Sequence, residues 1–572
     1  MSDKDAIDQN LPTGAQRIAQ ALQRHGVQYL FGQSNPPSVT LAAHSLGVKQ
    51  IGYRTENAGS YMADGFARVS GKIPVVTAQN GPAATLLVPG LAECLNASTP
   101  IVALVQDVAN GNRDRNAFQE LDHLALFQGV AKWVRRISAP ERIEDYVDMA
   151  FTAAASGRPG PAVLLCPADI FPKRQEPSVG RSSSIDSWPL DRFVADPSQV
   201  ELAAQILVNA ERPLVYAGGG VIGSRAQQEL RALQEQTGLP VATTTMGKGS
   251  VDETHPLSIG VIGFYMGKRG MSRYARHMVD TADVILLVGN RTNQNGTDSW
   301  NLLPRNAHYI HLDIDPNEIG RNYESVRLLG DIKATLPRLL EAMKLKGLEQ
   351  RSAARAGFES EIREARALHA EEVATVTTSS EIPLRPERLM AEVEQLLDDN
   401  AIVVADASFS SIWIANFLKA KQRRQFITPR GLAGLGWGFP MAMGAKLANP
   451  ERTVFCLVGD GGFGHVWSEL ETARRHGINV ILMVLNNQVL GYQLHAEEVG
   501  MGAHTDACDL TGVDHAAVAE ACGLRGIRVE HPDALKGALE QAVASDQTVL
   551  LDCIVDPDAM PPVGMFSQLT NY

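Results

Sequence analysis

Two runs of apolar residues in the last third of the chain flank a stretch with helical spacing. The runs, residues 454–458 and 480–485, lack alternating polar positions, which is typical of parallel strands buried on both faces. Residues 466–475 between them have the apolar spacing of a helix, and Gly477 stands where a helix commonly ends. The pattern predicts a β-α-β unit.

The same alternation of strand-like runs and helical stretches extends over most of the chain. Helices are expected over residues 14–25, 200–208 and from about 385. Strands are expected over residues 29–31, 75–78, 101–105, 162–166 and 401–405, and within 212–217, 281–290 and 308–316. We therefore predict an α/β fold with three doubly wound parallel-sheet domains.

Polar segments divide these three series of elements. The domains are predicted at residues 12–185, 190–345 and 385–572, with a linker over 346–384. The boundary near residue 185 follows a serine-rich stretch at residues 182–187. Within the linker, residues 349–374 are rich in Ala, Glu and Arg and predict a solvated helix, and residues 376–383 predict an extended connector.

Composition narrows the class of protein. The 572 residues are 44% hydrophobic and 20% charged, with a net charge of −12, which argues against a nucleic acid or an anionic membrane as partner. No apolar run approaches the length of a membrane span, and residues 1–10 lack the apolar core of a secretory signal. Six scattered cysteines form no CxxC pair. We expect a cytoplasmic protein with reduced cysteines.

Candidate chemistry lies at the ends of the first two strands described. The strand at 454–458 leads into Gly459, Asp460, Gly461 and Gly462, and the strand at 480–485 leads into Asn486 and Asn487. Ligands of open α/β sheets bind outside the carboxyl ends of the strands. Carboxylate and amide oxygens suit a hard cation, and glycines let backbone N–H groups approach an anion. An ordinary strand-to-helix turn is the alternative; the functional interpretation is a divalent cation held against a phosphate.

The spacing of these residues resembles the signature of thiamine diphosphate (ThDP) enzymes. That signature pairs GDG with NN after a similar interval, and here residues 462–485, 24 in all, separate Gly461 from Asn486. A second element, residues 54–68, resembles the pattern RxExAx₄AxGxAR of the same superfamily. Its Glu56 could be merely a helix-starting acid. The resemblance implies that Glu56 binds the aminopyrimidine ring and serves as the catalytic acid/base.

The resemblance extends over nearly the whole chain and implies a set of cofactor contacts. The three domains would be a pyrimidine-binding, a central Rossmann-like and a diphosphate-binding domain. Mg²⁺ would be held by Asp460, Asn487 and the carbonyl of Val489. Leu435 would bend the coenzyme, and Ser410 and Ser411 replace a usual Gln-His pair. The implied cofactor-binding residues are Glu56, Ser410, Ser411, Gly434, Leu435, Gly459, Asp460, Gly461, Gly462, Asn487, Val489 and Gly491.

One further element resembles the acetohydroxyacid (acetolactate) synthase branch of this superfamily. The sequence AFQE at residues 117–120 precedes Lys132, which lies 14 positions after Phe118. The resemblance implies that Phe118, Gln119 and Lys132 line the substrate side of the site. The alternative is that Phe118 belongs to the core and that Lys132 is a solvated base.

The branch implies decarboxylation of a 2-oxo acid, with pyruvate as the expected donor, and coupling of the resulting enamine to a second carbonyl substrate. Three departures from the branch keep a non-coupling decarboxylase open: residues 33–37, residues 81–83, and Ala496 in place of a Trp. Against a simple decarboxylase, none of the 14 histidines is adjacent to another. A non-catalytic regulatory homologue is the alternative of another class, and the joint presence of Glu56, Asp460 and Asn487 argues against it.

Two questions stay open at this stage. The central domain holds FAD in some branches, but residues 264–267 and 292–295 depart from the synthase pattern and Gly218–Gly220 alone is weak evidence for a nucleotide. In the superfamily the coenzyme lies between subunits, so Glu56 and Asp460 are expected to meet across the interface of a homodimer or homotetramer.

Overall fold

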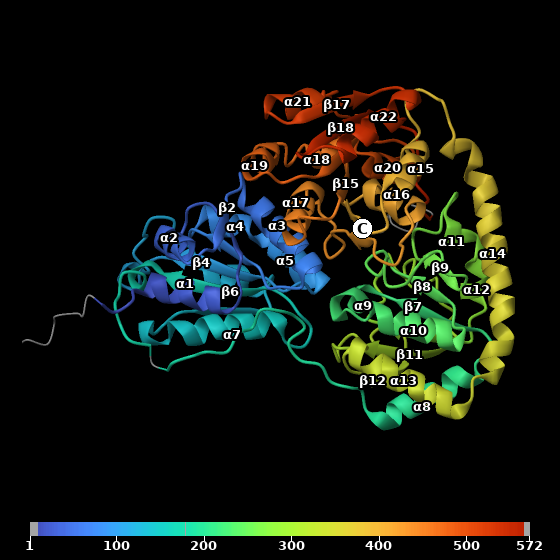
Figure 1. The fold of residues 1–572 in the computed structure, drawn as a ribbon, viewed down its shortest axis with the longest axis horizontal. Coiled ribbons are helices and arrows are strands. Elements are labelled where there is room, and N and C mark those ends of the chain that lie inside the picture. The colour runs from blue at the N-terminus through green and yellow to red at the C-terminus, as the bar shows by residue number, and fades with distance from the viewer. Residues whose placement is uncertain (1–9, 178, 565–572) are drawn as a thin grey trace, which may run out of the picture.

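The computed structural model describes residues 10–177 and 179–564, whose strands form three sheets of six strands each. Every strand pair in these described sheets is parallel. Helices flank each sheet, so the predicted α/β fold with three domains is confirmed (Figure 1). The prediction about a secretory signal at residues 1–10 falls almost entirely outside the described residues.

The first domain is built on a sheet that follows the predicted strands closely. Its strands are β1 (Tyr29–Phe31), β2 (Lys49–Ile51), β3 (Val75–Ala78), β4 (Val102–Asp107), β5 (Trp133–Arg136) and β6 (Ala162–Pro167), in the order β2-β1-β3-β4-β6-β5. Its helices are α1 (Gly14–Arg24), α2 (Pro37–Ser45), α3 (Glu56–Ser70), α4 (Pro82–Leu86), α5 (Val88–Ala97), α6 (His123–Gln128) and α7 (Ile143–Ala155). The side chain of Thr13 caps α1, and Gly71 ends α3 in the left-handed conformation, at φ 69°.

The central domain repeats this arrangement. Its strands are β7 (Pro213–Ala217), β8 (Val241–Thr243), β9 (Ser258–Val261), β10 (Val284–Val288), β11 (His308–Asp313) and β12 (Ser325–Leu329), in the order β12-β11-β10-β7-β8-β9. Its helices are α8 (Pro197–Asn209), α9 (Gly219–Ser224), α10 (Gln227–Thr237), α11 (Met271–Tyr274), α12 (Arg276–Asp280) and α13 (Ile332–Lys346).

A long helix, α14 (Glu349–Thr377), leads from the central to the third domain along one side of the molecule (Figure 1). The prediction of a helix here is confirmed, but it is not solvated all round. Phe358, Ile362 and Ala365 form a stripe that is buried against the central domain. The predicted extended connector over 376–383 is wrong at its start, because α14 continues to Thr377.

The third domain contains the β-α-β unit that the hydrophobic pattern predicts. Its strands are β13 (Ile402–Ala405), β14 (Gln425–Ile427), β15 (Val454–Gly459), β16 (Ile481–Asn486), β17 (Arg525–Val529) and β18 (Val549–Ile554), in the order β14-β13-β15-β16-β18-β17. Its helices are α15 (Pro386–Leu396), α16 (Phe409–Phe417), α17 (Gly438–Ala448), α18 (Asp460–Phe463), α19 (Glu469–His476), α20 (Gly491–Met501), α21 (His515–Ala521) and α22 (Pro532–Val543).

The prediction of one helix over residues 466–475 is wrong at its start, because the structure has two shorter helices in this region. The first, α18, begins directly at Asp460, and α19 begins only at Glu469. Val466 lies in the turn between them, where it is buried in the core that the first and third domains share. The predicted end is confirmed, because Gly477 caps α19 at φ 60°. An apolar residue can therefore belong to the core without belonging to the helix that its spacing suggests.

The first and third domains share one hydrophobic core, although more than 300 residues separate the helices that meet there, α3 and α17. Helix α3 packs along α17, and the two lie side by side in Figure 1. A Cβ on Gly65 would lie 2.0 Å from the carbonyl oxygen of Met441, and one on Gly444 would lie 1.8 Å from that of Met62. The close crossing of the two helices thus depends on both glycines, and it fixes the two domains relative to each other.

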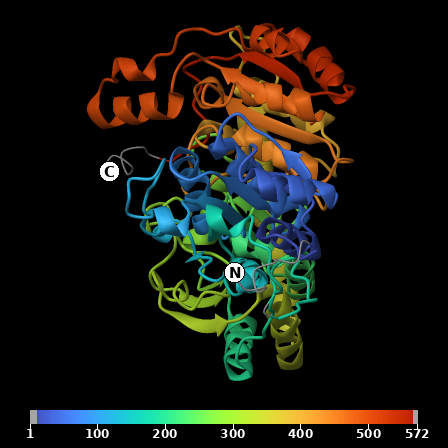
Figure 2. The ribbon, with the colours of Figure 1, turned by 90° about the vertical axis from the view of Figure 1, so that its left-hand side faces the viewer.

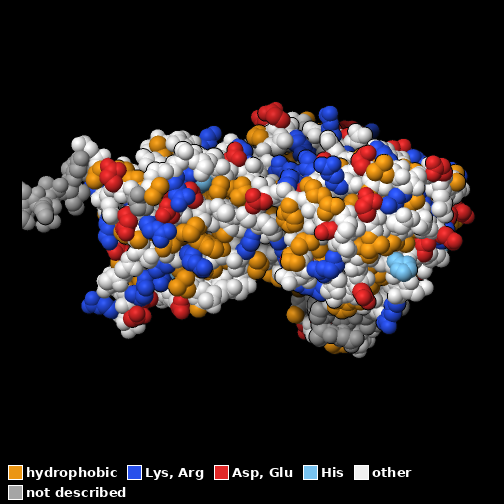
Figure 3. Space-filling model, turned by 90° about the horizontal axis from the view of Figure 1, so that it is seen from below, with side chains coloured by type: hydrophobic (Ala, Val, Ile, Leu, Met, Phe, Trp, Pro, Cys, Tyr) orange, Lys and Arg blue, Asp and Glu red, His pale blue; other side chains and the backbone are white. Residues whose placement is uncertain are grey.

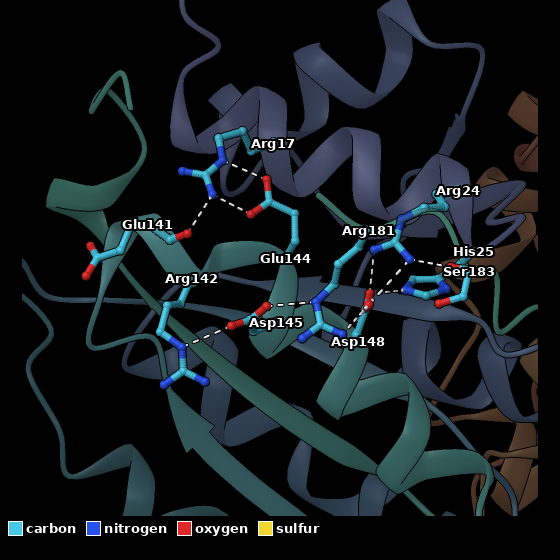
Figure 4. A network of polar contacts seen from close by, with 10 residues as sticks. All are labelled: Arg17, Arg24, His25, Glu141, Arg142, Glu144, Asp145, Asp148, Arg181 and Ser183. Atoms are coloured by element: carbon cyan, nitrogen blue, oxygen red, sulfur yellow. Dashed lines mark hydrogen bonds and ion pairs between the residues drawn. The ribbon is translucent and has the colours of Figure 1, made fainter. Parts of the chain in front are cut away.

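A polar network ties the segment after the first domain to helices α1 and α7 (Figure 4). His25 accepts a hydrogen bond from the backbone N–H of Ile185 at 2.9 Å, and its other ring nitrogen contacts Asp148 at 2.8 Å. Arg181 contacts Asp145 at 2.7 Å, and Arg24 donates to the carbonyl of Ser183. The serine-rich stretch predicted as a linker is therefore anchored to the first domain.

The described helices, the surface charges and the cysteines bear on what the composition led us to expect. No described helix has the length and apolar character needed to cross a membrane. On the face seen from below, acidic, basic and hydrophobic side chains are interspersed (Figure 3). All six cysteines are free, and five of them are buried, so the prediction that the cysteines lie in the core is confirmed for those five. Helix α20 has no buried residue and extends away from the body of the third domain (Figure 2).

Candidate active site

The carboxyl ends of β15 and β16 bring Asp460 and Asn487 together. The two strands are paired in register up to Gly459 and Leu485, so the residues that follow lie side by side. The backbone N–H of Gln488 donates to Asp460 Oδ2 at 2.7 Å, and that of Gly461 donates to Oδ1 at 2.9 Å. Burial raises the pKa of Asp460 to about 6. A neighbouring cation would favour the charged carboxylate that such burial disfavours.

Three polar groups converge at this point. The end of the Asn487 side-chain amide lies 3.3 Å from Asp460 Oδ1 and 3.0 Å from the carbonyl oxygen of Val489. Gln488 between them has a left-handed backbone, at φ 60°, which turns the chain so that the Val489 carbonyl faces back. In the absence of a cation, the amide nitrogen at this position donates to both oxygens, and with a cation bound a rotation by 180° would direct the amide oxygen there instead. A carboxylate, an amide and a carbonyl oxygen form the donor set that Mg²⁺ prefers, so the three predicted metal ligands fit that ion.

The glycines around Asp460 serve two purposes. A Cβ on Gly462 would lie 2.3 Å from Asp406 Oδ2, and one on Gly461 would lie 2.5 Å from a methyl group of Leu490, so both positions are needed for packing. A Cβ on Gly459 would meet no atom within 4 Å. Gly491 begins α20, where an added Cβ would lie 3.2 Å from the ring of Phe409. Open space therefore lies only beside Gly459 among these four.

The loop that carries Gly434 and Leu435 is held by a buried carboxylate that the sequence analysis missed. Asp406, at the end of β13, accepts the backbone N–H groups of Gly436 at 2.9 Å, Trp437 at 3.1 Å and Gly438 at 3.2 Å. Its signal in the sequence is its place directly after the strand predicted at residues 401–405. Leu435 is half-buried beside this anchor.

The structure gives Ser411 a local role instead of a free hydroxyl. Its Oγ donates to the carbonyl of Ser408 at 2.8 Å, and Arg430 donates to the same Oγ. Ser410 and Ser411 are both buried at the start of α16. Phosphate binding by this pair stays a prediction, and for Ser411 it would require the hydroxyl to exchange these partners.

Glu56 is the first residue of α3 and is half-buried. The two residues before it, Arg54 and Thr55, donate their backbone N–H groups to Glu469 of the third domain. Burial, followed by the charge of Glu56, raises the pKa of the neighbouring Tyr53 hydroxyl. Glu56 thus lies on the side of the first domain that faces the third.

Phe118 and Gln119 lie in the loop after β4. The Phe118 side chain is 80% exposed, so the alternative that it belongs to the core is wrong. The amide of Asn80 donates to the carbonyls of both residues at 3.0 Å, and Gln119 has a left-handed backbone at φ 59°. The side-chain oxygen of Gln119 is buried and has no hydrogen-bond partner among the described residues. A ligand that reached that oxygen would supply its missing hydrogen bond.

A buried histidine missed by the sequence analysis supports this loop. His123 accepts the backbone N–H of Gly81 at 2.9 Å on Nε2, and its Nδ1 contacts Asp107 at 3.1 Å. Because Nε2 accepts, the proton lies on Nδ1 and the ring is neutral. Burial would raise the pKa of Asp107, but the His123 hydrogen bond and Arg136 hold it below its usual value. A Cβ on Gly81 would lie 2.7 Å from that of Gln119, so the two turns pack closely.

Lys132 does not join Phe118 and Gln119 within the subunit, which corrects the expectation that all three flank one site. It directly precedes β5 and donates its backbone N–H to Pro161, just before β6, at 2.9 Å. Because the strands are parallel, their amino ends lie at one edge of the sheet, whereas Phe118 follows the carboxyl end of β4. The Lys132 side chain is exposed, and its ammonium donates to the carbonyl of Ser156. Partial desolvation together with the charge of Arg158 lowers its pKa to about 8.

A cavity of about 590 Å³ lies between all three domains. The carboxyl ends of β7, β10 and β11 contribute Gly218–Gly220, Gly289 and Asp313 to its wall, and burial raises the pKa of Asp313 to about 6. Three acidic side chains line it, against nine basic ones: Arg68, Arg158, Arg225, Arg231, Arg291, Lys333, Arg423, Arg424 and Arg430. The excess of cations suits an anionic ligand of nucleotide size.

Comparison with known proteins gives matches over most of the chain. Three family models described as parts of thiamine pyrophosphate enzymes match it: the N-terminal TPP binding domain at residues 12–126, the central domain at 200–339 and the C-terminal TPP binding domain at 406–553.

Several curated proteins match almost end to end. A probable acetolactate synthase large subunit from Methanocaldococcus jannaschii is 33% identical, over 98% of this chain and 94% of its own. An acetolactate synthase from Arthrospira platensis is 32% identical over 96% of both chains. The acetolactate synthase isozyme 3 large subunit of Escherichia coli is 31% identical over 95% of both.

Proposed function

The chain belongs to the thiamine pyrophosphate enzymes, in their acetolactate synthase-like branch, and from this premise we propose that it decarboxylates a 2-oxo acid and couples the remaining carbon unit to a second carbonyl substrate. Pyruvate is the proposed donor, because the relatives are named acetolactate synthases. The observation that carries the proposal is the convergence of the Asp460 carboxylate, the Asn487 amide and the Val489 carbonyl at the strand ends of the matched TPP binding domain.

Residues of the third domain would hold the cofactor. Asp460, Asn487 and the Val489 carbonyl would bind Mg²⁺, and the open space beside Gly459 would admit the diphosphate. Leu435 would give apolar support between the two rings. When bound, thiamine diphosphate supplies a thiazolium that accepts electrons during decarboxylation. The protein positions that group and excludes water around it.

The first domain would supply proton transfer and substrate contacts. The Glu56 carboxylate would exchange a proton with the aminopyrimidine ring, as a half-buried acid at a helix start is able to do. The amide of Gln119, with its unpartnered oxygen, would orient the incoming carbonyl substrate. Ala496 would leave more room for the acceptor than a tryptophan, so a loose choice of acceptor is proposed.

We propose a homodimer, alone or paired into a tetramer, as the active form. Several apolar side chains are strongly exposed on the described chain: Leu41 at 70%, and Phe118 and Met501 at 80% each. Helix α20 has no buried residue. A second subunit would cover these surfaces and bring the Glu56 face of one chain to the Asp460 site of the other.

The central cavity is proposed to hold a nucleotide with a diphosphate, and FAD is the candidate to test first. Its volume, its excess of arginines and the glycine-rich turn after β7 support this assignment. Release of ligand by acid from purified protein, followed by absorbance and mass measurement, would identify FAD or another nucleotide.

One experiment tests the activity directly. The full-length protein is incubated with ThDP and Mg²⁺ and a panel of 2-oxo acids, alone and in pairs, and products are identified by mass. Coupled products from pyruvate support the proposal. Aldehyde alone from every donor supports the decarboxylase alternative, and failure to bind ThDP supports a non-catalytic homologue. Glu56→Gln is the matched control, which should bind ThDP and give no product.

A further inference from the structure

A buried glutamate of the third domain holds the backbone just before Glu56. Glu469, the first residue of α19, is 0% exposed. Its Oε1 accepts the backbone N–H of Arg54 at 3.1 Å and that of Thr55 at 3.2 Å, and the Arg54 N–H also lies 3.3 Å from Oε2. The Thr472 hydroxyl donates to its Oε2 at 2.7 Å. The carboxylate is thus satisfied largely by the backbone of another domain, 414 residues away in the chain.

The first domain makes the converse contact to the third. Glu93, on α5, is also 0% exposed. Its two oxygens accept the backbone N–H groups of Gly431 at 2.7 Å, Leu432 at 2.6 Å and Ala433 at 3.3 Å. Ala433 has a left-handed backbone, at φ 63°. The Arg68 guanidinium lies 3.4 Å from Glu93 and gives it a countercharge.

Both contacts end directly beside a residue assigned to the coenzyme. Arg54 and Thr55 precede Glu56, and residues 431–433 precede Gly434 and Leu435. The second loop is held from both sides, because Asp406 binds the N–H groups of residues 436–438. Leu435 therefore lies between two groups of three anchored N–H groups. A contact that only joined the domains would have no reason to be placed at these two loops.

We propose that Glu469 and Glu93 are reciprocal positioning residues: each domain uses one buried carboxylate to set the loop through which the other domain meets the coenzyme. The catalytic part of this inference rests on the proposed function. Glu469 sets the start of α3 and hence the direction of Glu56. Glu93, together with Asp406, fixes the backbone on both sides of Leu435 and so sets the position of the Leu435 side chain in the site.

The chemistry of the side chain explains why glutamate stands at both positions. A carboxylate offers two oxygens, each able to accept more than one hydrogen bond, and donates none. At Glu93 both oxygens accept backbone N–H groups, so a glutamine there leaves one N–H facing an amide NH₂. At Glu469 a glutamine keeps Oε1 for Arg54 and Thr55 and loses only the longer second contact of the Arg54 N–H with Oε2. The Thr472 hydroxyl can rotate to accept from the glutamine NH₂. Glu469→Gln is therefore the conservative variant, and Glu93→Gln is not.

The first test measures the loops themselves and needs no coenzyme. Glu469→Met and Glu93→Met keep side-chain length and remove the acceptors, and each variant is the control for the other. Amide hydrogen exchange of the full-length protein should rise about tenfold or more at residues 54–57 in the first variant, and at 431–435 in the second, without crossover. Unchanged exchange at these segments would overturn the inference. If either methionine variant does not fold, the corresponding Glu→Asp variant, shorter by one methylene, replaces it.

The second test separates positioning from a merely structural role. For Glu469→Met, hydrogen exchange at C2 of bound ThDP should slow about tenfold or more, while the apparent affinity for ThDP with Mg²⁺ stays within about threefold of wild type. Glu469→Gln should restore the exchange rate. Arg474→Gln, at an exposed position of the same helix, is the control and should change neither quantity.

The outcomes are distinguishable. Faster amide exchange at 54–57 with normal C2 exchange would show that Glu469 only joins the domains, and would overturn the positioning role. Equal losses of affinity and C2 exchange would also overturn it. A wild-type protein that binds ThDP but never exchanges its C2 hydrogen would overturn the proposed function and with it the catalytic part of the inference. The amide exchange would in that case still decide whether the two glutamates order the loops.

Discussion

At the scale of single residues, the most informative feature is the cluster of Asp460, Asn487 and Val489. The sequence motif predicted all three as metal ligands, and the structure brings the three groups together, while metal binding itself stays a prediction. Their proximity could be predicted because each residue lies at, or just after, the end of one of two adjacent parallel strands. The geometry of a β-α-β unit is local, so spacing along the chain translates directly into proximity.

Replacing Asp460 should abolish the response to cofactor. In Asp460→Ala the charged ligand is lost, so Mg²⁺ and the diphosphate it anchors bind weakly. Thermal unfolding should show the wild type stabilised by ThDP plus Mg²⁺ and the variant not stabilised. Asp509→Ala, an exposed acid in a nearby loop, is the control and should keep the full stabilisation. If Asp460→Ala also kept it, the metal site would lie elsewhere.

The placement of Lys132 leads to a prediction about product choice. Gln119 has an unpartnered amide oxygen beside Phe118, whereas Lys132 lies at the opposite edge of the sheet and contacts Ser156. Gln119→Ala should therefore lower coupling and raise the share of free aldehyde, by roughly the tenfold effect of one lost hydrogen bond. Lys132→Met should leave the ratio of coupled product to aldehyde unchanged. A changed ratio in Lys132→Met would place its ammonium at the site of another subunit.

Asp313 predicts a pH dependence of stability. Burial raises its pKa to about 6, from 3.8, so between these values the folded protein binds more protons than the unfolded chain. The free energy of unfolding should then fall as pH rises from about 4 to 6, by up to about 3 kcal/mol. Measured without added ligand, the thermal midpoint of wild type should fall relative to that of Asp313→Asn over this range. Parallel pH profiles would contradict the prediction.

Residues that act between domains escaped prediction. Glu93 and Glu469 carry no motif, because their partners are backbone N–H groups 338 and 414 residues away. Every residue except proline has a backbone N–H, so such a partner leaves no signature in the sequence. Asp406 and His123 were missed for the same reason. The motifs identified side chains that contact the coenzyme in the family. The structure adds the side chains that hold the backbone of the neighbouring loops in place.

At the scale of elements, the strands were predicted best and the short helices worst. Buried parallel strands are continuous apolar runs, and they recur at the expected places in all three sheets. The helix expected at 466–475 failed because Val466 and Leu470 share one core while only the second is helical. Apolar spacing reports which side chains are buried, and a short turn can bury them as well as a helix.

The crossing of α3 and α17 gives a prediction for stability. A Cβ on Gly65 would overlap the Met441 carbonyl, so Gly65→Ala should force the helices apart and cost about 1–3 kcal/mol, as overpacking does. The first thermal transition should move to lower temperature. Gly537→Ala is the matched control: it lies in α22 where an added Cβ meets nothing within 4 Å, so it should be neutral or stabilising. Equal shifts in both variants would contradict the close-packing argument.

At the scale of the whole molecule, three sheets surround one cavity, and two of the domains share a core. The sequence allowed the number and class of the domains to be predicted, because each repeats the same alternation. It did not allow their arrangement to be predicted. Domain contacts depend on surfaces such as that of Gly65 against Met441, where a missing side chain is the decisive feature and leaves no periodic pattern.

The shared core also has a consequence for the order of synthesis. The face of α3 that contains Met62 and Gly65 is covered by α17, which leaves the ribosome roughly 370 residues later. At 5–20 residues per second, the newly made first domain waits on the order of 20–70 s with that apolar face uncovered. During this interval the nascent chain is a natural client for a chaperone, and a slower translation rate would lengthen its exposure. The first domain can therefore reach its final packing only after most of the chain has been synthesised.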